Sequence, residues 1–172
     1  MKRFVVAVAT VIVMSTIGVG PASAAGGGAA KETGPVGFVL SSASCGNLPA
    51  GTTVNGTGVR KSITTTRTGR DGVTTIENST HARGTATDQN GNAYVFNYSN
   101  QFRVSNTVAD PAVFTGMMND SFALAGRGPA KLTNGFLAIF TTDFDTFFAF
   151  QPNRSRGDPI DFTNGSAHCD PL

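Results

Sequence analysis

The stretch YVFNYSNQFRV, residues 94–104, carries the clearest structural signal in the chain. Apolar and polar side chains alternate along it, with Tyr94, Phe96, Tyr98, Phe102 and Val104 at even positions and Asn97, Ser99, Gln101 and Arg103 at odd ones. Because successive side chains of a β-strand point to opposite faces of a sheet, this spacing predicts a strand with one buried and one solvated face.

Turn signals divide the chain around this strand. Arg70-Asp71-Gly72 separates the predicted strands 59–68 and 73–87, and Asn90-Gly91 separates 73–87 from 93–104. Asp-Gly and Asn-Gly are favoured in tight hairpins, because both central residues of a type I′ turn take positive φ. Asn134-Gly135 is expected to introduce another strand. The alternation of large and small side chains over residues 117–126 predicts one more.

The last third of the chain is rich in phenylalanine at even positions, from Phe136 to Phe150. This spacing is compatible with one very long strand, or with a hairpin that turns at Asp143–Asp145, because aspartate favours turns. Asp110-Pro111 could begin a single helical turn, with Asp as the N-cap. No other segment after residue 24 shows helical periodicity, so we predict an all-β fold.

Short connections between the predicted strands favour an antiparallel arrangement. We predict one β-domain over residues 36–172, built as a single antiparallel barrel of about six to eight strands. A barrel has no exposed edge strands, which is the reason for preferring it. The alternative is a two-sheet β-sandwich.

The N-terminus predicts export. Lys2 and Arg3 precede an apolar run of 16 residues and the small residues Ala22-Ser23-Ala24, which is the pattern of a cleaved signal peptide over residues 1–24. The run is shorter than a membrane-spanning helix needs, so no integral membrane segment is expected. We expect a secreted protein. Residues 25–35, rich in Gly and Ala, are predicted to be a flexible lead-in.

Cleavage changes the charge of the chain. Without Lys2 and Arg3, 11 of the 13 basic residues remain, which equals the 11 acidic residues. A neutral chain has no overall attraction to nucleic acid, so we predict no nucleic-acid partner. A neutral total charge is still compatible with local basic patches on the surface.

Cys45 and Cys169 are the two cysteines of the chain. In an exported protein they predict a disulfide that ties the two ends of the domain together. They lack the CxxC spacing of redox or metal-binding pairs. The two histidines and the scattered aspartates also lack the spacing of a zinc or calcium site, so no metal or cofactor is predicted.

The even-numbered aromatic residues could line the interior of a barrel and bind a small apolar or amphipathic ligand. Two arginines in Arg-Gly segments at strand ends could hold a carboxylate or phosphate at its mouth. The predicted ligand-binding residues are Phe96, Tyr98, Phe122, Phe140, Arg127 and Arg156. In the alternative reading the arginines pair with Asp158, Asp161 and Asp170 and hold the C-terminal segment.

No G-x-S-x-G, P-loop or H-E-x-x-H motif occurs, and we assign no catalytic residue. A non-enzymatic binding protein is therefore the leading hypothesis. An enzyme of the small-barrel cyclase or isomerase kind is the second, and it predicts a pocket containing at least two of Asp120, Asp143, Arg127 and His81. A cell-wall or host-interaction protein is the third, and it predicts a contiguous exposed apolar patch.

The chain resembles small secreted β-proteins of actinobacteria. The resemblance depends on the Ala-rich N-terminal lead, on Leu48-Pro49-Ala50-Gly51, on the stretch 94–104 and on the segment 120–128. The likeness covers residues 45–170. It implies a secreted β-domain and, since that family has no established activity, it supplies no catalytic residues. The expected barrel is similar to a lipocalin, but the chain has no tryptophan and so lacks the G-x-W start.

Overall fold

The computed structural model describes residues 28–157, 160–161 and 168–169. For residues 147, 160–161 and 168–169 it describes the backbone alone. The predicted signal peptide, residues 1–24, lies outside this range.

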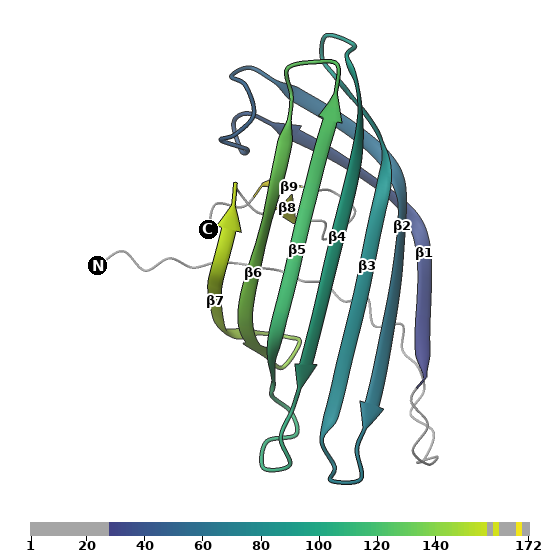
Figure 1. Ribbon diagram of the computed structural model, residues 1–172, viewed down its shortest axis with the longest axis vertical. Helices are drawn as coiled ribbons and strands as arrows, with labels where there is room; N and C mark the ends of the chain where they lie inside the picture. The colour runs from purple at the N-terminus through teal and green to yellow at the C-terminus, as the bar shows by residue number, and fades with distance from the viewer. Residues whose placement is uncertain (1–27, 158–159, 162–167, 170–172) are drawn as a thin grey trace, which may run out of the picture.

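Seven antiparallel strands follow one another in a single sheet, each paired with its neighbours in the sequence (Figure 1). They are β1 (Ala29–Ser41), β2 (Thr53–Thr68), β3 (Thr74–Asp88), β4 (Ala93–Ser105), β5 (Phe114–Gly126), β6 (Leu132–Thr142) and β7 (Phe147–Arg156). β8 (Ile160–Asp161) and β9 (His168–Cys169) form a separate two-stranded sheet. The described residues contain no helix, and Asp110-Pro111 lies in a loop between β4 and β5. The all-β prediction is confirmed.

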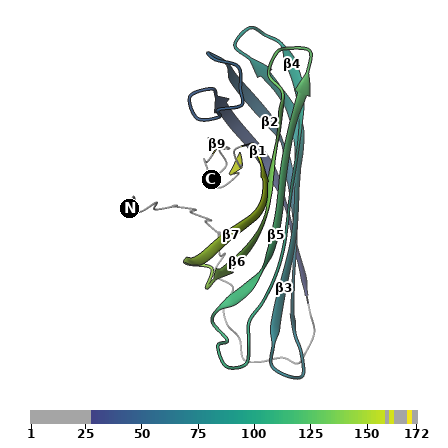
Figure 2. The ribbon, with the colours of Figure 1, turned by 60° about the vertical axis from the view of Figure 1, so that its left-hand side comes forward.

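The sheet is curved, and β8–β9 lies on its concave side (Figure 2). β9 contacts β1. Within the described strands, however, β1 pairs with β2 alone and β7 with β6 alone, so the sheet has two edges and is open. Seven strands agree with the predicted six to eight, but closure into a barrel is not confirmed.

The alternation predicted for residues 94–104 is confirmed, because the even-numbered side chains of β1–β6 face the core. We call this side the inner face and the opposite side, with the odd-numbered side chains, the outer face. At the core, Phe38 packs edge-on against Phe96 and Phe122, with ring centroids 4.9 and 5.8 Å away. A Cβ on Gly58 or Gly84 would lie 2.7 Å from the Phe96 ring, so this ring packs directly on the backbones of β2 and β3.

The hairpins lie where the turn dipeptides predicted them, but their type differs. Gly72 and Gly91 have φ of 81° and 80°, whereas Asp71 and Asn90 are not among the positive-φ residues. Gly72 N donates to Gly69 O, and Gly69 N donates to Val73 O, so the loop runs over residues 70–72. The prediction of tight hairpins at both positions is confirmed. The type I′ geometry given as the reason for them is not found, because each turn is a three-residue loop that ends in a single left-handed glycine.

The Phe-rich segment is a hairpin, as one of the two alternatives predicted. Asp143 Oδ1 accepts hydrogen bonds from the backbone N–H groups of Asp145 (3.0 Å) and Thr146 (2.6 Å), which forms the turn between β6 and β7. Phe144 within it has φ of 72°. Asn134-Gly135, in contrast, lies inside β6 and does not introduce it.

The structure also corrects the predicted lead-in. β1 begins at Ala29, so the segment from Ala29 to Pro35 belongs to the sheet. β2 extends to Thr68 and pairs along this whole segment, from Ala29 with Thr65 to Pro35 with Val59. A long partner strand orders residues that have little tendency to order by themselves.

Candidate functional site

Four of the predicted ligand-binding residues share the inner face. Phe96, Phe122 and Phe140 are 1, 1 and 2% exposed, and Tyr98 is 9% exposed. Phe96 and Phe122 stack with their centroids 6.1 Å apart and belong to the core around Phe38. Phe96, Tyr98 and Phe122 therefore fill the upper part of the inner face, the end at which β1 reaches Ser41. Phe140 lies toward the lower end, where its ring centroid is 6.2 Å from that of Phe102.

A polar row crosses the middle of the inner face. Ser62, Thr80, Asn100 and Asp120 are successive cross-strand partners on β2 to β5. The Ser62 and Thr80 hydroxyls lie 2.8 Å apart, and Asn100 Nδ2 donates to Asp120 Oδ2 over 2.8 Å. The Tyr98 hydroxyl donates to the same carboxylate oxygen over 2.7 Å. We call Ser62, Thr80, Asn100 and Asp120 the inner polar row.

Asn78 extends the inner polar row toward the lower end of the sheet. Its Nδ2 donates to Ser62 Oγ (3.0 Å) and Thr64 Oγ1 (2.8 Å), and its Oδ1 accepts from Thr80 Oγ1 (2.9 Å). Because every bond in this part of the network joins neutral amides and hydroxyls, it presents a polar but uncharged surface.

Half-buried apolar side chains adjoin this network on the same face. The register continues from Asn78 to Phe102, Met118 and Ala138 on β4, β5 and β6. Phe136 and Phe150 lie beside them, with ring centroids 5.5 Å apart. We call Phe102, Met118, Phe136 and Phe150 the lower inner surface; all four are half-buried. The sequence placed them on the even face, but their remaining exposure follows only from the curvature of the sheet and the position of β8–β9.

The two arginines lie elsewhere. Arg127 is in the β5–β6 loop and Arg156 is at the end of β7, and both are exposed. Arg127 is nine residues past Met118 in a nearly continuous strand, which corresponds to about 30 Å. Arg127 therefore does not adjoin the lower inner surface, whereas the exposed Arg156 pairs in register with Gly135, the residue before Phe136. Their alternative partners, the Asp158, Asp161 and Asp170 side chains, lie outside the described part of the structure.

The four residues of the enzyme hypothesis are not gathered in one pocket. Asp120 is buried on the inner face, whereas His81 is exposed on the outer face. Asp143 lies in the β6–β7 turn, and Arg127 lies at the opposite end of the sheet. Among the described residues, no group of three or more His, Cys, Asp or Glu side chains could hold a metal ion.

Asp88 is a buried carboxylate with a local structural environment. Its oxygens accept hydrogen bonds from the backbone N–H groups of Asn90 and Asn92, from Asn92 Nδ2 and from the Tyr94 hydroxyl, at 2.8–2.9 Å. These bonds, the one from the Asn92 side chain first, lower the pKa of Asp88 despite its burial. Burial, and then the bond to Asp88, raise the pKa of Tyr94. The carboxylate organises the β3–β4 turn.

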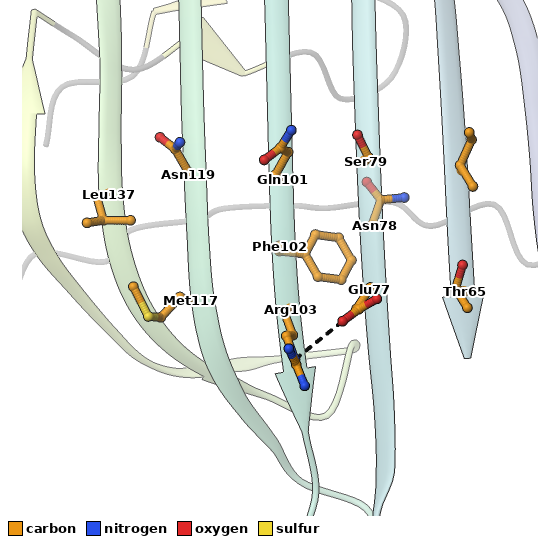
Figure 3. A pocket seen from close by; sticks show the side chains of 11 residues that line it. Thr65, Glu77, Asn78, Ser79, Gln101, Phe102, Arg103, Met117, Asn119 and Leu137 are labelled. Atoms are coloured by element: carbon orange, nitrogen blue, oxygen red, sulfur yellow. Dashed lines mark ion pairs between the residues drawn. The ribbon is translucent and has the colours of Figure 1, made fainter. Parts of the chain in front are cut away.

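The outer face carries two adjoining grooves. The lower outer groove, about 450 Å³, lies over β2–β6 and is drawn in Figure 3. Ser79, Gln101 and Asn119 lie side by side in it, and Glu77 and Arg103 form an ion pair of 3.4 Å. The upper outer groove, about 860 Å³, contains residues of the same strands closer to the β3–β4 turn. Sequence reasoning missed both grooves, although short polar side chains at odd positions, such as Ser99 and Ser121, were a signal for them.

Within the described residues, no helix has the length and hydropathy to cross a bilayer. Comparisons with known proteins add nothing to this geometry: no family model, no curated protein and no solved structure matches the chain.

Proposed function

We propose that the chain is a secreted, non-enzymatic protein that binds a small amphipathic ligand on the inner face of its curved sheet. The observation that carries this proposal is the contact between the lower inner surface and the polar network. Phe102 is the cross-strand partner of Asn78, and Met118 is the partner of Phe102, so apolar and hydrogen-bonding groups form one continuous surface.

The apolar part supplies the affinity. Covering about 200 Å² of apolar surface contributes about 5 kcal/mol before the costs of association are subtracted. The curvature of the sheet, with β8–β9 on the concave side, supports a barrel-like enclosure of this surface.

The polar part supplies orientation. Asn78, Thr80 and Asn100 are half-buried and lie next to the apolar side chains. Their amides and hydroxyls suit a neutral head group that donates and accepts hydrogen bonds. The ligand predicted here is therefore an alcohol or amide with an apolar body, and not the carboxylate or phosphate that Arg127 and Arg156 suggested.

The signal peptide and the two cysteines support the extracellular setting of the proposal. Cys45 is fully buried in the core, and no cysteine of the described part is a free thiol. β9, which contains Cys169, contacts β1. We include the Cys45–Cys169 disulfide in the proposal; the Cys169 side chain lies outside the described residues.

Binding can be tested with the exported protein and N-phenylnaphthylamine, a neutral lipophile whose fluorescence rises in apolar surroundings. We expect saturable binding that Met118→Ser weakens about tenfold, because one buried apolar contact of this size contributes about 1.5 kcal/mol or more. Native mass spectrometry of protein from its own host should show a copurified small molecule.

Met117→Ser is the matched control. Met117 is the next residue along β5, but it lies on the outer face and is 52% exposed. The same chemical change there should leave probe binding unaltered. Equal losses in the two variants, or no uptake of the probe by the wild type, would contradict the proposal.

A further inference from the structure

The upper outer groove contains three basic side chains at adjacent positions. Lys61 on β2 pairs in register with His81 on β3, and Arg83 follows His81 on the same face of β3. All three side chains are exposed. They come from two neighbouring strands, so their spacing is set by the sheet and not by a loop.

No acidic side chain balances this cluster within the groove, because no Asp or Glu is among its lining residues. The ion pairs of the described side chains, Glu32–Arg60 and Glu77–Arg103, involve neither Lys61 nor Arg83. The upper outer groove is therefore locally cationic in a chain that is neutral overall after cleavage.

The rest of the groove is uncharged and combines apolar residues, such as Val59 and Ala123, with short polar ones. Asn97, Ser99 and Ser121 lie between the basic cluster and β6. Two residues further along the same strands, a rise of about 7 Å, Ser79, Gln101 and Asn119 continue this surface into the lower outer groove (Figure 3). The two grooves thus form an elongated trough with positive charge at one end and with hydroxyl and amide groups interspersed among apolar side chains along its length.

We propose that this trough binds an anionic, hydroxyl-rich polymer, namely a polysaccharide or polyol chain that carries carboxylate or phosphate groups. Lys61 and Arg83 bind the anionic group by charge-assisted hydrogen bonds. The serine, asparagine and glutamine side chains bind the hydroxyl groups. The site is separate from the proposed ligand surface, since it lies on the opposite face of the sheet.

Two other polyanionic partners fit this surface less well. Single-stranded nucleic acids need exposed aromatic side chains on which the bases stack. The aromatic residues that line the two grooves, Tyr98, Phe102 and Phe122, are even-numbered residues of the inner face, and none is exposed. A membrane surface is contacted best by protruding basic residues, whereas Lys61, His81 and Arg83 line a recess.

The test uses the exported protein in calorimetric titrations with polygalacturonate and with poly(glycerol phosphate), and with dextran as the neutral polymer. We expect binding to at least one of the charged polymers, weakened by added salt, and none to dextran. The Lys61→Gln/Arg83→Gln variant should bind about tenfold more weakly or worse, because each hydrogen bond to a charged group contributes about 1.5 kcal/mol or more.

Arg67→Gln/Arg70→Gln removes the same charge from exposed positions at the β2–β3 turn and should lower affinity less than about twofold, as expected for screened charges. Ser99→Phe should block the trough without changing its charge. All these positions are exposed or half-buried on the outer face or in a turn, so folding, checked by circular dichroism, should be retained.

Three results would overturn the proposal. The first is an absence of binding to both charged polymers. The second is an equal loss of affinity in the two double variants, which would indicate a general charge effect. The third is tighter binding to phosphatidylglycerol vesicles or to single-stranded DNA than to either polymer, which would assign the face to another partner.

Discussion

Asp88 shows how one side chain can join three segments of this fold. It is the last residue of β3, and its carboxylate accepts hydrogen bonds from the backbone N–H groups of Asn90 and Asn92 in the turn to β4. It also accepts a hydrogen bond from the Tyr94 hydroxyl. That hydroxyl in turn accepts a hydrogen bond from Ala130 N (3.3 Å) in the β5–β6 loop. A carboxylate at this position therefore couples two hairpin ends that are adjacent only in the folded sheet.

Asp88 predicts a pH dependence of stability. Because its folded-state pKa is lowered, its contribution is present above the ordinary carboxyl pKa and is lost as the pH falls through the folded value. We expect Asp88→Asn to have a lower Tm than the wild type at about pH 6, and this difference to narrow at about pH 3. Thermal unfolding followed by circular dichroism measures both.

The control for this prediction is Asp145→Asn, at an exposed position in the β6–β7 turn. It removes one carboxylate without affecting the β3–β4 turn. If Asp88→Asn and Asp145→Asn change the pH profile to the same extent, the proposed role of Asp88 is wrong.

At the scale of the elements, the open sheet has two edge strands, and both carry features that discourage pairing with other chains. β1 contains Pro35, Lys31 and Glu32. β7 contains Pro152 and two arginines, and its register with β6 shifts at Leu137/Ala138 and Thr141/Thr142. Prolines, charges and bulges are the devices by which natural sheets protect their edges. The strands can therefore stay unpaired at their outer edges without aggregation.

We predict that Pro152→Thr promotes self-association. The substitution adds a backbone N–H and a residue with high β-propensity to an exposed edge strand. Light scattering after size-exclusion chromatography should show oligomers that increase with protein concentration. Ser155→Thr, also on β7 and exposed, adds similar β-propensity but no new N–H, and should remain like the wild type. Association in both variants, or in neither, would refute the explanation.

At the scale of the whole molecule, the two faces of one sheet have different chemistry. The inner face combines a buried aromatic core, a polar row and a half-buried apolar surface, whereas the outer face carries a trough of mixed polar and apolar residues with a basic end. Two proposed binding surfaces can therefore coexist on a sheet one layer thick. Met118→Ser tests the inner face, and Lys61→Gln/Arg83→Gln tests the outer face.

The ends of the domain are predicted to be joined by the Cys45–Cys169 disulfide. In the chain-entropy model, closing a loop of this length stabilises the fold by about 4–5 kcal/mol. Reduction of the exported wild type should therefore lower its Tm markedly, and Cys169→Ser should have the same low Tm with or without reductant. Thiol alkylation followed by mass spectrometry should find no free thiol in the unreduced wild type. Two alkylated cysteines there would contradict the pairing.

Local patterns predicted the elements well, because they depend on short-range geometry. The parity of residues 94–104 follows from the period of a strand, and the hairpins at Gly72 and Gly91 follow from the left-handed conformations that glycine allows. Asn134-Gly135 failed as a turn signal because the pairing of β6 with β5 and β7 outweighed local turn preference. The same long-range pairing placed Ala29–Pro35 in a strand.

The sequence by itself determined the all-β class, the faces of the strands and the inward position of Phe96 and Phe122, since each depends on side-chain type and spacing along the chain. Only the tertiary structure decided which inner-face side chains stay accessible, that Arg127 lies far from them, and that Lys61, His81 and Arg83 meet in one groove. These features depend on register and sheet curvature, which arise from the summed contacts of all seven strands and are encoded in no single stretch.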